Sequence, residues 1–160
     1  MNEVERRIRD EYCDVLNRPR PGIEVEAVPG NRRHFNAVLL GPKDSPYENG
    51  RFAIEFFYPN DYPAKPPLVI FRTKIFHPNV DLVGRVDHPV LRHWKPATTM
   101  AEMLAALRNL LGFPDSMYAL DMQVKAEWDN DLDAALTKAF ETTLLFIFQP
   151  ESGLYNMQLD

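Results

Sequence analysis

The chain has 160 residues, a net charge of -5 and an apolar fraction of 45%, which predicts one globular domain of ordinary composition. Its Lys and Arg residues are scattered among acids, which argues against a nucleic-acid-binding stripe. The longest apolar run, residues 144–148, is far shorter than the roughly 20 residues that span a bilayer, so no membrane insertion is expected. The single cysteine and the lack of a signal-peptide pattern at the N-terminus indicate the cytoplasm, the nucleus or both.

The first half of the chain predicts a helix followed by an antiparallel meander. Apolar residues recur at helical spacing over residues 3–16, and the prolines after Asn17 end that helix. Beyond it, short runs with alternating or apolar character are separated by Gly- and Pro-rich turns, which is typical of strands. The expected strands are 23–27, 35–40, 52–58 and 68–72.

The second half predicts a long loop and three helices. Residues 74–97 carry three prolines and little periodicity, and a loop of this length inside a compact domain is usually functional. Thr99 and Glu102 then form a capping box for a central helix, and Gly112 suits its C-terminal cap. Two C-terminal helices are expected near 119–128 and 130–148, the second with an apolar residue at every fourth position: Leu132, Leu136, Phe140, Leu144 and Phe148.

Four sequence blocks, in order and near the expected spacing, resemble the family of ubiquitin-conjugating enzymes. They are the turn at residues 40–50, the proline-rich segment Tyr58 to Pro67, the segment Ile75 to Val80 with Gly84 to His88, and the loop Trp94 to Thr99. The resemblance implies a UBC-like α+β fold with a four-stranded antiparallel meander, an N-terminal helix, a central helix and two C-terminal helices. It also implies a cis bond between Tyr62 and Pro63. We expect a domain over 1–148 and a tail over 149–160.

The resemblance also points to a missing residue. In this family a cysteine follows the His-Pro-Asn triplet by eight residues and carries ubiquitin as a thioester, whereas the eighth residue after Asn79 is Asp87. A carboxylate is a poor nucleophile toward a thioester, and its acyl product, a mixed anhydride, hydrolyses readily. We expect Asp87 to be an exposed loop aspartate without a chemical task. Shifting the register does not supply a thiol, because no cysteine lies between residues 14 and 160.

Further positions depart from the family pattern. Tyr118 stands where many members have an acid that helps to deprotonate the attacking lysine, Ala64 stands where many ligase-binding members have a bulky aromatic, and Pro89 replaces an acidic position. These changes together suggest that the chain is not an enzyme but a catalytically inactive homologue. The degenerate site then has no catalytic residue and consists of His77, Pro78, Asn79, Asp87 and Tyr118.

The individual residues of that site have structural interpretations. The family assigns the asparagine to oxyanion stabilisation, but an amide also bonds local backbone, and we favour this structural task for Asn79. His77, His88 and His93 are spaced unlike any standard zinc site, so neither a metal nor a cofactor is expected. Cys13 is expected to be exposed on the first helix, beside acidic residues that disfavour a thiolate.

We therefore expect a binding or scaffold module that regulates ubiquitin conjugation or serves as an adaptor subunit. The aspartate after Gly84-Arg85-Val86 is also similar to the fused-toes type of inactive homologue, which occurs in adaptor complexes. The expected partners are proteins: a ligase, an active conjugating enzyme, ubiquitin or an adaptor complex. The alternative is an active-site-substituted form of a genuine ubiquitin or ubiquitin-like conjugating enzyme. The candidate partner-binding residues are Arg6, Arg7, Arg9, Ala64, Pro96, Ala97, Leu145, Phe146 and Phe148.

The last of these residues belong to a helix end that is apolar on every side. The segment Leu144 to Phe148 cannot bury all its side chains against one core. Two explanations remain open. Either the tail Pro150 to Leu159, with Leu154, Tyr155 and Met157, folds back over this end, or a second chain covers it.

Overall fold

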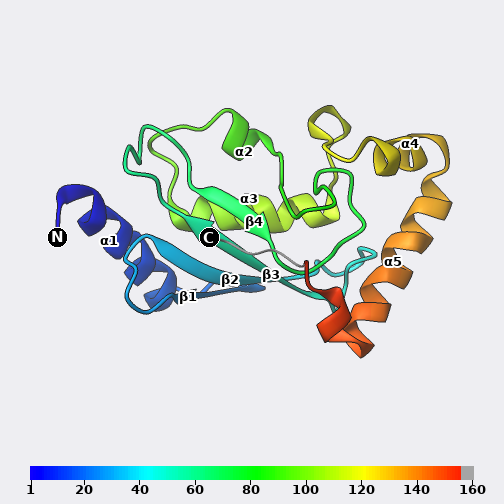
Figure 1. Ribbon diagram of the computed structural model, residues 1–160, viewed down its shortest axis with the longest axis horizontal. Coiled ribbons are helices and arrows are strands. Elements are labelled where there is room, and N and C mark those ends of the chain that lie inside the picture. The colour runs from blue at the N-terminus through cyan, green and yellow to red at the C-terminus, as the bar shows by residue number, and fades with distance from the viewer. Residues whose placement is uncertain (156–160) are drawn as a thin grey trace.

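An antiparallel four-stranded sheet with a helix against one face forms the centre of the protein, as shown by a computed structural model that describes residues 1–155 (Figure 1). This is the expected α+β fold. The elements in chain order are α1 (Glu3–Asn17), β1 (Ile23–Ala27), β2 (His34–Leu40), β3 (Arg51–Phe57), β4 (Leu68–Phe71), α2 (Pro89–Arg92), α3 (Met100–Gly112), the 3-10 helix η1 (Ser116–Tyr118), α4 (Met122–Asn130), α5 (Leu132–Phe148) and the 3-10 helix η2 (Pro150–Gly153).

The strands follow one another in the order β1-β2-β3-β4 and pair antiparallel throughout. Val25 lies opposite Ala37, Ala37 opposite Ile54, and Ile54 opposite Phe71. Because side chains alternate between the faces of a strand, this register brings one residue set to the inner face. Phe35, Ala37, Leu39, Phe52, Ile54 and Phe56 are all buried there, in the cluster that also holds the apolar residues of α3.

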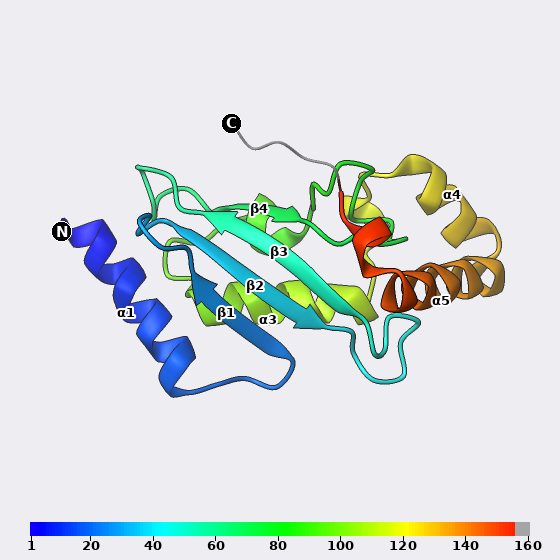
Figure 2. The same cartoon turned by 60° about the horizontal axis from the view of Figure 1, so that its bottom comes forward.

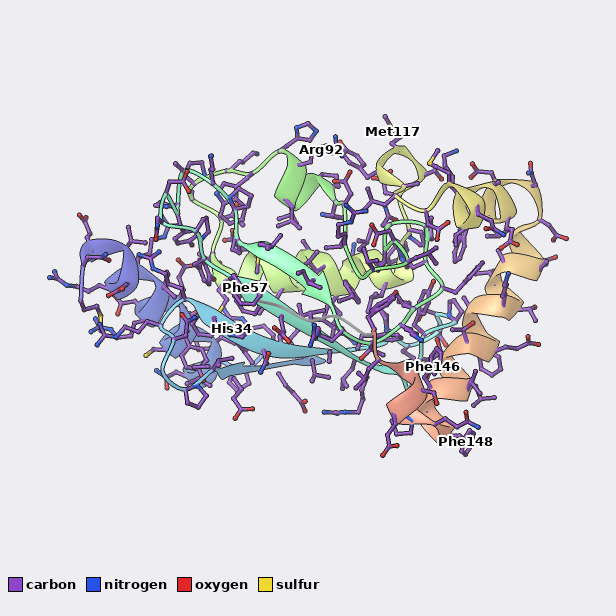
Figure 3. All side chains as sticks on the ribbon, in the orientation of Figure 1. His34, Phe57, Arg92, Met117, Phe146 and Phe148 are labelled. Carbon is purple, nitrogen blue, oxygen red and sulfur yellow. The ribbon has the colours of Figure 1, made fainter. Side chains whose placement is uncertain are left out.

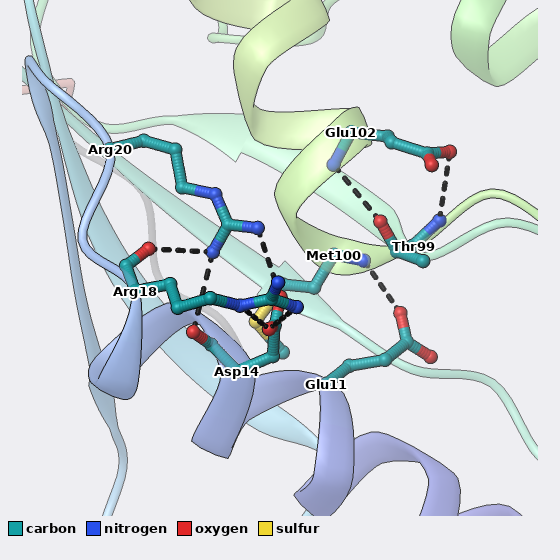
Figure 4. Close-up of polar contacts among 7 residues, drawn as sticks. All are labelled: Glu11, Asp14, Arg18, Arg20, Thr99, Met100 and Glu102. Carbon is teal, nitrogen blue, oxygen red and sulfur yellow. Dashed lines mark hydrogen bonds and ion pairs between the residues drawn. The ribbon is translucent and has the colours of Figure 1, made fainter.

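The central helix α3 begins as the sequence predicts. Thr99 Oγ1 accepts a hydrogen bond from the Glu102 backbone N–H, and the Glu102 carboxylate accepts one from the Thr99 N–H, which completes the capping box (Figure 4). Gly112, by contrast, is the last helical residue, and Phe113 follows as the C-cap without a left-handed conformation. The helix contributes Met100, Met103, Leu104, Leu107, Leu110 and Leu111 to the buried interior.

Helix α1 is tied to the start of α3 by one carboxylate. Glu11 Oε1 accepts from the Met100 N–H at 2.6 Å (Figure 4). Glu11 Oε2 accepts from the Tyr62 hydroxyl at 2.7 Å. The first N–H groups of a helix have no partner within that helix, so Glu11 satisfies one of them from another element. At the other end of α1, hydrogen bonds from Arg18 and Arg20 lower the pKa of Asp14.

Helices α4 and α5 lie at the opposite end of the sheet from α1 (Figure 2). The buried residues of α5 are small: Ala135, Ala139 and Thr143. The larger apolar residues that recur every fourth position are only partly buried or exposed, and Phe140, Leu144 and Phe148 lie on the exposed side. Small side chains allow α5 to approach the sheet end closely, and Gly50 allows the same from the facing loop, since a Cβ there would lie 2.9 Å from Thr143.

Several boundaries differ from the expectations. The loop 74–97 contains the short helix α2, whose single turn carries too few residues for a periodic pattern. The two C-terminal helices begin later than expected, because Asp121 and Asp131 cap them through their side chains. The Tyr62–Pro63 peptide bond is cis, which confirms the expectation. Within residues 1–155 no helix is long and apolar enough to cross a membrane.

Candidate functional site

The site segment, residues 75–93, follows β4 along the chain and ends with the short helix α2. His77 anchors it in the core, since it is fully buried and its Nε2 donates to the Leu110 carbonyl at 2.8 Å, while its Nδ1 accepts from the Asn79 N–H at 3.1 Å. Burial lowers the pKa of His77 to about 4, although the bond to Leu110 acts in the opposite direction. His77 is therefore a neutral, hydrogen-bonded core residue.

Asn79 links the site segment to the loop after α3. Its Oδ1 accepts from the Asp115 N–H at 2.9 Å, and its Nδ2 donates to the Asp115 carbonyl at 2.8 Å. Its own carbonyl accepts from the Asp87 N–H at 3.0 Å. The amide thus joins two backbone segments, which agrees with the expected bonding to local backbone. Nδ2 carries a second hydrogen beyond the one in the bond to Asp115, although the side chain is fully buried.

Asp87 is not the exposed, idle aspartate that the sequence suggested. It is buried, with 8% of its surface exposed, and its carboxylate forms a two-pronged ion pair with the Arg92 guanidinium. Arg92 Nε donates to Oδ1 at 3.1 Å, and Nη2 donates to Oδ2. This pair raises the pKa of Arg92. The expectation was wrong because α2 folds back as one turn and brings a cation to the carboxylate.

The guanidinium also connects Asp87 to Tyr118. Arg92 lies over the Tyr118 ring at 6.0 Å, and the Tyr118 hydroxyl lies 3.0 Å from His93 Nε2. His88 caps α2 by accepting from the Val90 N–H at 3.0 Å, and burial lowers its pKa against the opposing influence of Asp115 and Asp87. The structure therefore brings Asp87 and Tyr118, two of the predicted site residues, into one network through Arg92.

A second group of predicted residues meets at the end of the domain near α1. Arg7 Nη2 donates to the Pro96 carbonyl at 2.5 Å and Nε donates to Glu11 at 2.9 Å. Ala97 lines a shallow groove together with Arg7 and Thr99. Trp94 Nε1 donates to the Pro63 carbonyl at 2.8 Å, which holds the loop of Ala64 beside the loop of Pro96.

The three basic residues of α1 differ in their contacts within the chain. The guanidinium of Arg7 is engaged within the chain, and Arg9 pairs with its neighbour Asp10 at 2.9 Å. Arg6 is exposed, as are Ala64, Pro96 and Ala97. The predicted contact surface at this end therefore presents mainly Arg6 and small or rigid side chains, with Arg7 serving to hold the loops.

The predicted partner-binding residues at the C-terminal end of α5 differ in their exposure. Phe146 is half-buried beneath the segment that follows α5, since a Cβ on Gly153 would lie 2.7 Å from its side chain. Leu145 and Phe148 remain exposed (Figure 3). The tail folds back as far as Tyr155, whose N–H donates to the Arg72 carbonyl at 2.8 Å; Met157 and Leu159 lie outside the described residues.

The remaining sequence interpretations concern thiols and metals. Cys13 is free and exposed, as expected. In the part of the chain that the structure describes, no group of three His, Cys, Asp or Glu side chains could hold a metal ion. His77, His88 and His93 in particular are engaged with Leu110, Val90 and Tyr118, respectively.

Sequence reasoning did not identify Arg92 and Glu11. Arg92 follows Asp87 by five residues with a proline between them, and no helical period relates the two. Glu11 joins α1 to α3 across 89 residues of sequence, a contact for which a single sequence carries no signal. Both residues reach their partners only through the tertiary fold.

The antiparallel sheet, the central helix and the His77–Asn79 arrangement together define a UBC-type domain. The sequence pattern described as "Ubiquitin-conjugating enzyme" matches residues 7–143. The chain belongs to the ubiquitin-conjugating enzyme family.

Individual relatives cover nearly the whole domain. The chain is 37% identical over 147 residues to "Ubiquitin-conjugating enzyme E2 13" of Saccharomyces cerevisiae, covering 91% of this chain and 96% of that one. It is 38% identical over 147 residues to "Ubiquitin-conjugating enzyme E2 N" of Macaca fascicularis, covering 91% and 97%. It is 36% identical over 148 residues to "Putative ubiquitin-conjugating enzyme E2 N-like" of Homo sapiens, again covering 91% and 97%.

These relatives correct one expectation. The departures at Ala64, Asp87, Pro89 and Tyr118 suggested that the chain is not an enzyme. Relatives 37–38% identical over most of the chain are named as ubiquitin-conjugating enzymes, which points to an enzyme. The earlier interpretation relied on individual positions, whereas the likeness extends over 91% of the chain.

Proposed function

We propose that this chain takes part in ubiquitin conjugation by binding other proteins of that process, as a regulatory binding or scaffold module or as an adaptor subunit. The observation that carries the proposal is the ion pair between Asp87 and Arg92 at the position where the family has its cysteine. A thioester needs a sulfur atom, and here a carboxylate is held by a guanidinium. The surrounding scaffold, from His77 to Asn79, keeps its hydrogen bonds.

The partner surface that we assign to this role is the end of the domain formed by α1 and the loops of Ala64 and Pro96. Arg7 and Trp94 hold its backbone through hydrogen bonds. The exposed residues are therefore already in place before a partner binds. A prearranged surface loses less conformational freedom on binding. The partners that fit are a ligase, an active conjugating enzyme, ubiquitin or an adaptor complex. We place this activity in the cytoplasm, the nucleus or both, where a free exposed thiol such as Cys13 persists.

The second candidate is an active-site-substituted form of a ubiquitin or ubiquitin-like conjugating enzyme, that is, of a transferase. The names of its relatives favour this candidate. So does the intact geometry of Asn79, whose amide retains one N–H beyond its bonds to Asp115.

A thioester assay separates the two candidates. Wild type, Asp87→Cys and Asp87→Cys/Cys13→Ser are incubated with activating enzyme, ATP and ubiquitin, and then run on a non-reducing gel. The binding role expects no thiol-sensitive band one ubiquitin heavier for wild type. The second candidate instead expects such a band for Asp87→Cys/Cys13→Ser, because restoring the cysteine completes the site, whereas a band on wild type could come only from Cys13. The variant without Cys13 ensures that any band from Asp87→Cys comes from the site.

The binding role is tested directly by adding the chain to a reaction of activating enzyme, an active conjugating enzyme, a ligase and ubiquitin. We expect a concentration-dependent change in the rate or linkage of ubiquitin chains. The variant Ala64→Arg should abolish this change, because it places a long cation on the proposed surface. The matched control Ala126→Arg alters an exposed alanine of α4 at the opposite end and should leave the change intact. No effect of wild type at any concentration contradicts the proposal.

A further inference from the structure

The exposed side of α5 presents an apolar surface, which we call the α5 outer face: Phe140, Leu144, Leu145 and Phe148. The exposed fraction of these side chains runs from 40% for Leu144 to 77% for Phe148. Phe140, Leu144 and Phe148 follow the spacing at which residues share one side of a helix. Phe148 lies at the outer end of the helix (Figure 3).

The tail does not cover this surface. The segment after α5 turns back on the opposite side, where Gly153 packs on Phe146 and Leu154 pairs with Thr73. The buried side of α5, with Ala139 and Thr143, also faces that way. The two sides of the helix therefore differ: one packs small residues against the domain, and the other leaves large apolar residues in water.

An acidic side chain stands within the apolar surface. Glu141 lies between Leu144 and Leu145 around the helix and is exposed, and Asp133 lies in line with Phe140 two turns earlier. Among residues 1–155 neither carboxylate forms an ion pair. The nearest cation of the helix, Lys138, is engaged elsewhere, because it pairs with Glu127 of α4 at 3.3 Å and lies over the Phe76 ring at 4.9 Å.

We propose that the α5 outer face binds an amphipathic helix of another protein, whose apolar side is bordered by Lys or Arg placed to meet Glu141 and Asp133. An apolar helix face with anchors at this spacing fits a second helix, and a covered carboxylate needs a cation or hydrogen-bond donor. The proposal concerns a different face from the site segment and stands independently of the proposed conjugation role.

Charge argues against a second copy of the chain as the occupant. Each copy carries a net charge of -5, and the α5 outer face of each contributes Glu141 without a free cation beside it. Pairing two such faces would bring like charges together, which weakens association. A basic partner helix instead meets the acids with opposite charge.

The test uses two synthetic helical peptides of about 18 residues, long enough to form helix. Both carry leucines along one side; one has lysines and the other glutamates beside them. Fluorescence anisotropy at low salt should show the lysine peptide binding about threefold to fivefold more tightly, as expected for an exposed ion pair. In Glu141→Lys the preference should reverse. Equal affinities for wild type, or an unchanged preference in the variant, overturn the proposal.

Two further variants locate the binding. Leu144→Asp should weaken the lysine peptide at least tenfold, because it places a charge where an apolar side chain is covered. Leu82→Asp changes an exposed leucine of the site segment, 83% exposed, and should leave affinity unchanged. Far-UV circular dichroism confirms that both variants are folded. If neither peptide binds, or if sedimentation shows a dimer that Leu144→Asp dissociates, the occupant is not a basic helix and the proposal is wrong.

Discussion

The site segment and the α5 outer face differ in how far the rest of the chain satisfies their side chains. Around Asp87, Asn79 and His77, buried polar groups find partners inside the chain. On α5, Leu144 and Phe148 are large apolar groups that the described residues leave 40% and 77% exposed. The polar groups of the first region are paired within the chain, whereas the apolar groups of the second region are exposed to solvent.

The difference indicates where contacts with other molecules contribute. Buried polar groups that are fully paired stabilise one backbone arrangement, and breaking them costs stability. An exposed apolar surface adds little to the stability of the isolated chain but gains free energy when something covers it. Substitutions in the site segment should therefore affect folding, and substitutions on the α5 outer face should affect binding.

The largest effect in this comparison is expected from Asn79→Ala. The substitution removes both hydrogen bonds to the Asp115 backbone and leaves the partly buried N–H and carbonyl of Asp115 unpaired, which costs about 2–4 kcal/mol of the free energy of unfolding. Urea denaturation measures this loss. Asn60→Ala, an exposed turn residue, serves as control and should change stability little. An unchanged midpoint for Asn79→Ala would remove the structural role.

A second effect concerns pH. Burial lowers the pKa of His77 from 6.5 to about 4, so the unfolded chain binds a proton before the folded chain does. Stability from this group is unaffected above pH 6.5 and falls as the pH drops toward 4, by roughly 2–3 kcal/mol at pH 4.5. Unfolding free energies of wild type and His77→Gln, measured from pH 7 to 4.5, should diverge, with wild type falling more steeply. Parallel curves contradict the assignment.

A smaller effect is expected from breaking the ion pair. Arg92→Met leaves the buried Asp87 carboxylate without its cation, whereas Asp87→Asn/Arg92→Met removes the charge as well. Because Arg92 is 56% exposed, water offsets part of the loss. The single variant should be less stable than the double variant, and both should lose less than Asn79→Ala. With Asp87→Asn as the second single variant, a double-mutant cycle by thermal denaturation measures the coupling, and zero coupling means that the pair is only a surface contact.

Much of the fold follows from local patterns. Thr99 and Glu102 identify the start of α3, alternation identifies the strands, and the His77-Pro78-Asn79 motif identifies the family scaffold. Such features depend on residues close together in sequence. They were recognisable without knowledge of the tertiary structure.

The site and the C-terminal helix were harder for a physical reason. The environment of Asp87 depends on the single turn of α2, which is too short to produce a period. The apolar residues at every fourth position of α5 predict a helix but not its orientation. Ala135 and Ala139 pack inward because small side chains permit close approach, and this choice leaves the larger residues outside.

The smallest effect is also the sharpest test of the open region. Phe148→Gln changes a side chain that is 77% exposed, so the free energy of unfolding should change by less than about 0.5 kcal/mol. Its matched partner Phe146→Gln alters a phenylalanine two positions earlier, packed under Gly153, and should cost about 1–2 kcal/mol through lost burial. Denaturation curves of the two variants compare the sides of one helix within the same two turns. If Phe148→Gln destabilises as much as Phe146→Gln, another part of the chain covers Phe148, and α5 offers no open face to a partner.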